Sequence, residues 1–121
     1  MDFQVLTNNP LVYERLKEKY AVTFLDCGYR ELLCRARDNI HQGYRLYSHP
    51  LSGSIKPNET PYKSLLLSKT AEKLDVKSLA LIENGIEVFD KFSPLPSDLP
   101  ARIREDFALV DYSLLESALA R

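Results

Sequence analysis

The architecture of the chain follows from residues 3–26, FQVLTNNPLVYERLKEKYAVTFLD, because a strand, a helix and a second strand are predicted there in succession. Phe3 to Thr7 is a short, mostly apolar run typical of a strand. Asn9 suits the N-cap of a helix and Pro10 its first position. Ala21 to Asp26 is rich in strand-forming residues. Between the strands, one helix face has apolar residues at four-residue spacing: Val12, Leu16 and Tyr20.

A second helix and a third strand are predicted next. The apolar positions of the helix follow the spacing of an amphipathic face, and Gly43 is expected to end it. Tyr44 to Ser48 is then predicted as strand three. The apolar positions of this helix are Tyr29, Leu32, Leu33, Ala36 and Ile40.

Alternation of strands and helices favours parallel pairing with right-handed crossovers. Leu65 to Leu67 is predicted as a fourth strand, and because no helix precedes it, we expect it to run antiparallel to strand three. The expected fold is a single α/β domain over residues 1–121. It is a three-layer sandwich around a mostly parallel sheet of about four strands, one of which can run antiparallel.

The second half of the chain predicts further helices. Asp75 suits the cap of a third helix. Residues 101–110 are compatible with a helix, or with a short helix followed by a strand at Phe107 to Val110. Ser113 to Glu116 fits a capping box, which favours a new helix from about Ser113. The third helix carries a stripe formed by Leu79, Ile82, Ile86 and Phe89.

Composition restricts the class of partner. The chain has 121 residues, of which 45% are hydrophobic and 27% charged, as in globular proteins. Its 16 Lys and Arg residues are balanced by 17 Asp and Glu residues. This balance provides no excess charge for nucleic acid or an anionic membrane, so neither is an expected partner.

The two cysteines do not indicate a metal or redox site. Cys27 and Cys34 are seven residues apart, without a CxxC pair. We expect both to be reduced and packed as small apolar side chains, and we expect no disulfide, metal or cofactor. The chain has no apolar run of membrane-spanning length. We therefore expect a soluble, cytoplasmic protein.

The most distinctive segment is the loop at residues 49–64, HPLSGSIKPNETPYKS. Its three prolines, at positions 50, 57 and 61, restrict the backbone, and most of its other residues are polar or charged. A stiff loop that presents polar groups is suited to binding. We expect it to be ordered without ligand.

In a doubly wound sheet, strands one and three can flank the position where the strand order reverses, and ligands bind there. Asn8 and Asn9, which follow strand one, would then face His49 and Ser52, which follow strand three, and the start of the first helix would favour an anion. The candidate ligand-binding residues are Asn8, Asn9, His49, Ser52, Gly53, Ser54, Lys56, Asn58, Glu59, Tyr62 and Lys63.

Structural alternatives exist for several of these residues. Asn8 and Asn9 can simply form a turn and a cap. His49 can act in proton transfer or can hold the loop through a hydrogen bond. Glu59 can pair with a lysine of the loop. Tyr62 can stack on a ligand or pack against the protein.

The chain resembles the GrdX family in three stretches: residues 7–12, the loop at residues 49–64, and residues 111–119. The resemblance covers most of the chain. Members of this family are small proteins encoded with the glycine, sarcosine and betaine reductases of anaerobic bacteria that ferment amino acids. The resemblance implies that reductase components are partners, and it provides no catalytic residues.

Three functional hypotheses follow. The first is a non-redox accessory protein of the reductase system that binds a small anionic ligand or a partner's peptide. The second is a small hydrolase or transferase with His49 as its acid-base group, although no nucleophile-base pair is recognisable in the sequence. The third is a docking subunit without a ligand. A concave polar pocket would favour the first two, and a flat exposed loop would favour the third.

Overall fold

The structure is a computed structural model that describes residues 2–51, 59–92, 95 and 98–120. Three strands and four helices lie in this part of the chain. In chain order they are β1 (Phe3–Thr7), α1 (Pro10–Leu16), β2 (Val22–Phe24), α2 (Tyr29–His41), β3 (Ser64–Ser68), α3 (Val76–Phe89) and α4 (Ala101–Leu119).

The three strands form a mixed sheet in the order β2-β1-β3. β1 is parallel to β2, with Val5 opposite Val22, and antiparallel to β3, with Val5 opposite Leu66. The predicted α/β class is confirmed. The prediction of a mostly parallel, four-stranded sheet is wrong, because β3 lies beside β1 and runs in the opposite direction.

The predicted third strand, Tyr44–Ser48, is not a regular strand. It pairs with the outer side of β3 at one antiparallel bridge, between Leu46 and Leu67. On either side of this bridge, a serine hydroxyl accepts the hydrogen bond that a backbone carbonyl would accept in a regular ladder. Ser68 Oγ accepts from the amide of Arg45 at 2.8 Å, and Ser48 Oγ accepts from the amide of Leu66 at 2.9 Å. The antiparallel direction relative to β3 was predicted correctly.

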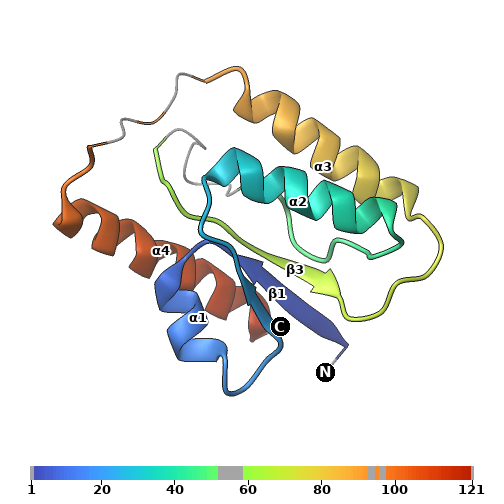
Figure 1. Ribbon diagram of the computed structural model, residues 1–121, viewed down its shortest axis with the longest axis horizontal. Helices are drawn as coiled ribbons and strands as arrows, with labels where there is room; N and C mark the ends of the chain where they lie inside the picture. Colours follow the sequence, from blue (N-terminus) through green and yellow to red (C-terminus); the bar gives the residue numbers. More distant parts are fainter. Residues whose placement is uncertain (1, 52–58, 93–94, 96–97, 121) are drawn as a thin grey trace.

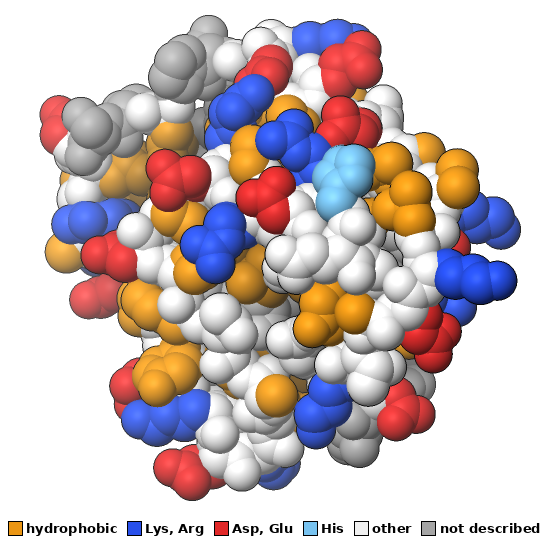
Figure 2. Space-filling model, turned by 45° about the vertical axis from the view of Figure 1, so that its right-hand side comes forward, with side chains coloured by type: hydrophobic (Ala, Val, Ile, Leu, Met, Phe, Trp, Pro, Cys, Tyr) orange, Lys and Arg blue, Asp and Glu red, His pale blue; other side chains and the backbone are white. Residues whose placement is uncertain are grey.

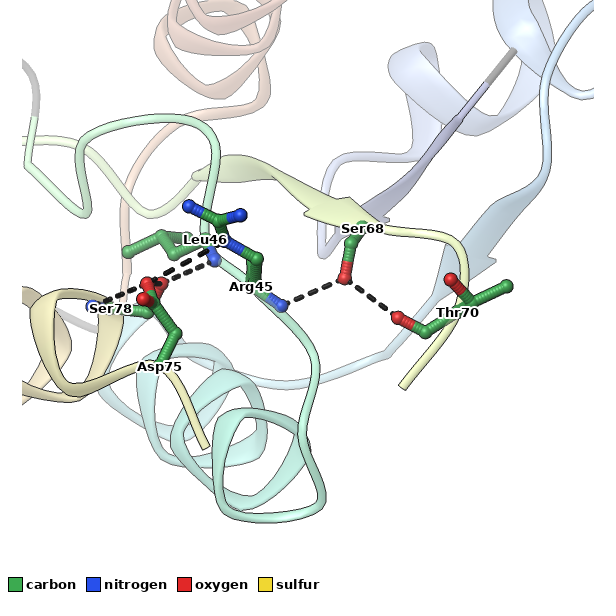
Figure 3. A network of polar contacts seen from close by, with 6 residues as sticks. All are labelled: Arg45, Leu46, Ser68, Thr70, Asp75 and Ser78. Atoms are coloured by element: carbon green, nitrogen blue, oxygen red, sulfur yellow. Dashed lines mark hydrogen bonds and ion pairs between the residues drawn. The ribbon is translucent and has the colours of Figure 1, made fainter. Parts of the chain in front are cut away.

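The start of α3 holds this segment in place (Figure 3). Asp75 caps α3, as predicted, by accepting from the amide of Ser78 at 3.1 Å. Ser78 Oγ donates to the Asp75 carboxylate at 2.6 Å and accepts from the amide of Leu46 at 2.8 Å. The outward-facing amide of Leu46 is therefore satisfied by a side chain.

Helices cover both faces of the sheet (Figure 1). α2 and α3 lie on one face, and α1 and α4 lie on the other. The larger core joins α2 and α3 to the sheet, and its fully buried members include Leu32, Leu33, Ile40, Leu65 and Ile82. The smaller core joins α1 and α4 to the sheet through Val5, Val12, Leu16, Leu66 and Leu115.

The tail is one continuous helix, α4, so the helical alternative for residues 101–110 is confirmed and the predicted new helix at Ser113 is wrong. The buried residues of α4 are Ala108, Asp111 and Leu115, whose spacing of three and four is helical. Burial of this face against α1 and β3 favours helix through the whole segment. The capping-box pattern at Ser113 lies inside the helix and does not start it.

Surface charge is mixed in sign. On the face shown in Figure 2, Lys and Arg side chains alternate with Asp and Glu side chains. This agrees with a formal net charge of −1. None of the helices in the described part of the chain combines the length and apolar character needed to cross a bilayer.

Gly85 lies where α3 crosses Pro50, and a Cβ at this position would be 2.9 Å from two carbons of the proline ring. We expect Gly85→Ala to lower the free energy of unfolding by about 1 kcal/mol. Overpacking of this kind costs about 1 to 3 kcal/mol, and the gain in helix propensity offsets about 1 kcal/mol. Urea denaturation measures the change.

Asn84→Ala is the matched control, because Asn84 is exposed and precedes Gly85 in the same helix. It should raise the free energy of unfolding by about 0.5 kcal/mol through helix propensity alone. Equal stabilisation by both substitutions would show that Pro50 does not restrict position 85.

Candidate functional site

The carboxyl end of β1 is joined to β3 and α4 by a buried polar network, which we call the Asp111 network: Thr7, Asn9, Ser64 and Asp111. All four side chains are at most 6% exposed. Asp111 Oδ2 accepts from Ser64 Oγ at 2.7 Å and from Asn9 Nδ2 at 3.0 Å. Thr7 Oγ1 lies 2.7 Å from Ser64 Oγ. Three segments that are distant in sequence are thereby held together.

The direction of each hydrogen bond follows from the available protons. Ser64 donates its only hydroxyl proton to Asp111, so it must accept from Thr7. Thr7 Oγ1 in turn accepts from the amide of Asn9 at 2.9 Å. Asn9 Nδ2 also donates to the carbonyl of Ala108 at 2.9 Å. The network is a directed chain of donors that ends on one carboxylate oxygen.

Asn9 also caps α1, as the sequence predicts. Its Oδ1 accepts from the amide of Leu11 at 3.0 Å, and Pro10 occupies the first position of the helix. One amide side chain therefore starts α1 and connects it to α4. The side chain is fully buried, so its polar groups are committed to the fold.

Asn8 joins three connections at the same end of the sheet. Its Nδ2 donates to the carbonyls of Cys27 at 3.0 Å and Pro61 at 2.9 Å. Its Oδ1 accepts from the amide of Lys63 at 2.9 Å. The group that faces Asn8 is thus the segment leading into β3. Strand one and residues 44–48 were expected to flank one ligand-binding position. This expectation is wrong, because β3 lies between β1 and residues 44–48.

Burial dominates the electrostatics of this region. It raises the pKa of the Asp111 carboxyl above its usual range, although donation by Asn9 and Ser64 and the charge of Lys63 act in the opposite direction. Burial lowers the pKa of Lys63, and the Asp111 charge partly opposes this. Burial and Asp111 together raise the pKa of the Tyr29 hydroxyl. A carboxyl, an ammonium and a phenol thus share one poorly solvated region.

Two hollows open beside this network. The first has a volume of about 1010 Å³ and lies at the carboxyl ends of β1 and β2 and the start of α2. The second has a volume of about 440 Å³ and lies between α1 and α4. Both are lined by Pro10, Tyr62 and Arg104, so they form one continuous surface that we call the groove. Ala108, which lines the second hollow, connects its wall to the network, because its carbonyl accepts from Asn9.

The groove has aromatic walls and a mainly acidic set of charges. The first hollow includes Phe24, Tyr29, Tyr62, Phe89 and Phe92. Among the described residues, five carboxylates line the two hollows, compared with two guanidinium groups. The acids are Glu14, Asp26, Glu31, Asp90 and Glu105, and the bases are Arg30 and Arg104.

Arg30 is not available as a free cation. Its guanidinium binds Asp90 through two contacts, at 2.7 and 3.0 Å. The hydrogen bond from Arg30 lowers the pKa of the Asp90 carboxyl. Among the described residues, no ion pair involves Arg104. Arg104 is therefore a cation with which the groove can contact an occupant.

The predicted site residues lie in different environments. Asn8 and Tyr62 line the groove, Asn9 belongs to the network, and Lys63 is buried next to it. Glu59 is exposed. The remaining loop positions, Ser52, Gly53, Ser54, Lys56 and Asn58, lie outside the described residues, as does the centre of the loop whose order was predicted.

His49 makes local contacts. Its Nδ1 accepts from the amide of Leu51 at 3.1 Å, and the ring is exposed. It is not among the residues that line the groove. This geometry matches the alternative in which the histidine holds the start of the loop through a hydrogen bond.

The cysteines are both free, as predicted, and both line the first hollow. Burial and the nearby Glu31 charge raise the pKa of the Cys27 thiol, which is the opposite of thiolate activation. Within residues 2–51, 59–92, 95 and 98–120, His, Cys, Asp and Glu do not gather in threes that could hold a metal ion.

The residues missed by sequence reasoning are Asp111, Ser64 and Arg104. Asp111 had a detectable signal, since it is a charged residue between Ala108 and Leu115 on one helix face. That signal depends on treating residues 101–119 as one helix. Ser64 and Arg104 had no comparable signal, because serine and arginine at such positions are usually solvated.

Comparison with known families identifies the chain. A family model for GrdX-like proteins matches residues 4–120, nearly the whole chain. The chain belongs to the GrdX-like family. The match includes both the network and the groove of this GrdX-like chain. No match to a curated protein or to a solved structure was found.

Proposed function

We propose that this GrdX-like chain is a non-enzymatic accessory protein that binds a peptide segment of a partner protein in the groove. One observation carries the proposal: the two hollows meet at Pro10, Tyr62 and Arg104. A concave surface that continues from the start of α2 to the space between α1 and α4 suits an extended chain. Its aromatic walls suit apolar side chains.

The charges of the groove support a basic peptide over a small anion. Once the Arg30–Asp90 and Lys17–Glu14 pairs are set aside, three carboxylates and Arg104 remain among the described lining residues. Lys63, one of the expected anion ligands, is buried and does not line either hollow. Acidic rims attract cationic segments and repel phosphates and carboxylates.

A binding role is also supported by the state of the polar groups. The Asn8 side chain is already hydrogen-bonded to backbone groups of Cys27, Pro61 and Lys63. Cys27 has a raised pKa, and His49 lies outside the groove. Asn8 and Cys27 therefore contribute to the shape of the groove, whereas His49 does not reach it. Because GrdX family members are encoded with glycine, sarcosine and betaine reductases, we propose that the peptide belongs to a component of those enzymes.

The first test is Tyr62→Ala, which removes the aromatic side chain shared by both hollows. Overlapping peptides that cover the reductase components are labelled, and their binding is measured by fluorescence polarisation. We expect the best basic peptide to bind Tyr62→Ala about thirtyfold more weakly, because a central aromatic contact contributes about 2 kcal/mol. Tyr47→Ala is the matched control, because Tyr47 is 52% exposed and lies outside the groove.

The sign of the charge effect separates the two kinds of occupant. Glu105→Lys should weaken the binding of a basic peptide several-fold, whereas it would strengthen the binding of an anion. Glu18→Lys, on an exposed position outside the groove, should change neither. Thermal stabilisation of the wild type by phosphate or small carboxylates, increased by Glu105→Lys, would contradict the peptide proposal and support an anion site.

A further inference from the structure

The two edges of the sheet differ in how they are covered. Beside β3, residues 44–48 cover the edge through the Leu46–Leu67 bridge and the hydroxyls of Ser48 and Ser68. At the opposite edge lies β2. In the described part of the chain, the main neighbours of β2 are β1 and α1, and no further strand continues the sheet there. The outer edge of β2 is therefore open to pairing with another backbone.

The register identifies the backbone groups on this open edge. The carbonyl of Ala21 accepts from β1 at 2.8 Å, and the amide of Leu25 donates to β1 at 2.9 Å. Backbone groups of alternate residues point to opposite edges of a strand, so the groups of Thr23 also face β1. The N–H and C=O groups of Val22 and Phe24 therefore point outward. Among the described residues, no segment outside the sheet hydrogen-bonds to them.

The open edge continues into the groove. Phe24 belongs to β2 and also lines the first hollow, as do Asp26 and Cys27 directly after the strand. At about 3.3 Å per residue, Val22 lies about 7 Å along the strand from Phe24. Both side chains are only partly buried, and Thr23 between them is exposed. An extended chain that leaves the first hollow therefore reaches both outward-pointing residues within about two further residues.

We propose that the peptide bound in the groove extends along β2 as an added strand. This inference rests on the proposed function, because it concerns the same occupant. The peptide backbone pairs with the N–H and C=O groups of Val22 and Phe24, and the groove holds the peptide side chains. Backbone pairing of this kind provides affinity, whereas pockets for side chains provide specificity. The occupant is therefore an extended segment that is basic in the groove and has no proline at the paired positions.

The length of β2 favours a peptide over a second copy of this chain. The strand comprises the three residues Val22–Phe24, so two copies paired edge to edge would share few hydrogen bonds and bury little surface. A peptide also gains contact with the aromatic walls of the groove. Such a short edge pairs weakly by itself, which limits aggregation. Pairing is expected when the groove holds the peptide beside the edge.

The first test is residue-resolved amide hydrogen exchange, measured by NMR. The protein is compared free and saturated with the basic reductase peptide that binds best in the polarisation assay. In the free protein, the amides of Val22 and Phe24 should exchange fast, whereas those of Thr23 and Leu25 should be protected by β1. The peptide should slow exchange at Val22 and Phe24 by about tenfold or more. Thr23 and Leu25 are the internal controls and should change by about threefold or less.

A scan of the same peptide by N-methylation provides an independent readout. A methyl group on an amide that faces β2 removes a donor and prevents close approach of the two backbones, so it should weaken binding about tenfold. The amide of the next residue faces away from β2, and its methylation should have little effect. Along the part of the peptide that pairs with β2, the losses should therefore recur at every second residue.

The outcomes separate this inference from the proposed function. Binding that depends on Tyr62 but leaves exchange at Val22 and Phe24 unchanged would overturn the added strand and leave the groove peptide in place. Losses on N-methylation without a period of two would do the same. Binding by none of the peptides would overturn both proposals. Protection of Val22 and Phe24 that rises with protein concentration in the absence of peptide would instead show a second copy at this edge, contrary to the proposal.

Discussion

Ile82→Ala is expected to lower the free energy of unfolding by about 2 to 5 kcal/mol, the range measured when a large aliphatic side chain is removed from a close-packed core. Ile82 is fully buried where α3 packs against α2 and the sheet. The substitution removes apolar burial and also leaves a cavity, and the surrounding side chains can fill only part of it. Urea denaturation at neutral pH measures the loss.

Leu81→Ala is the control for this substitution. Leu81 precedes Ile82 in the same helix but is 38% exposed. Because its side chain borders solvent, truncation leaves no closed cavity and should cost less than about 1 kcal/mol. Similar losses from the two substitutions would contradict the packing of α3 described above.

Asp111→Ala is expected to lower the free energy of unfolding by about 2 to 4 kcal/mol. Ser64 Oγ and Asn9 Nδ2 both donate to Asp111 Oδ2 in a region without access to solvent. A buried donor that loses its acceptor costs about 1 to 3 kcal/mol, and two donors are affected. Asn9 keeps its hydrogen bond to the carbonyl of Ala108, which limits the loss. Thermal and urea denaturation measure the change.

Asp106→Ala serves as the control, because Asp106 is exposed on the same helix. Its removal should change stability by less than about 0.5 kcal/mol. If Asp111→Ala were as stable as this control, the Asp111 network would contribute little to holding α4 on the sheet.

The stability of the wild type should also depend on pH through Asp111. Its folded pKa is raised above the ordinary value of 3.8 by burial. Between these two values the folded state binds more protons than the unfolded state, so stability decreases as pH rises through this window. Relative to Asp111→Asn, which does not titrate, the wild type should be most stable below the ordinary pKa of Asp111 and should lose that advantage as pH rises through the raised folded pKa. A relative stability that increases with pH would contradict this direction.

Local signals in the sequence predicted much of the fold. β1, the cap at Asn9, α2 and the cap at Asp75 each depend on residues close to one another, and all are present. The segment at Tyr44–Ser48 was mispredicted as a strand because strand propensity describes a residue's fit to a sheet surface, whereas a ladder needs a partner backbone in register. Here Ser48 and Ser68 hydroxyls take two of the partner positions.

The candidate site was predictable in part for the same reason. Asn8 and Asn9 directly follow a predicted strand, so their position at the end of the sheet could be inferred. Their partners could not, because Asp111 is 102 residues from Asn9 in sequence and Lys63 is 55 residues from Asn8. A pattern along the chain contains no distance between such segments.

By itself, the sequence determined the α/β class, the family, the unpaired cysteines and the starts of α1 and α3, because each depends on composition, spacing or neighbouring residues. Only the tertiary structure decided that β3 lies antiparallel beside β1, that residues 101–119 form one helix, and that two hollows join into a groove. Those features depend on which apolar and polar surfaces are buried together. Burial of the Ala108, Asp111 and Leu115 face is the clearest case, because packing against α1 and the sheet favours helix where local propensity allows either structure.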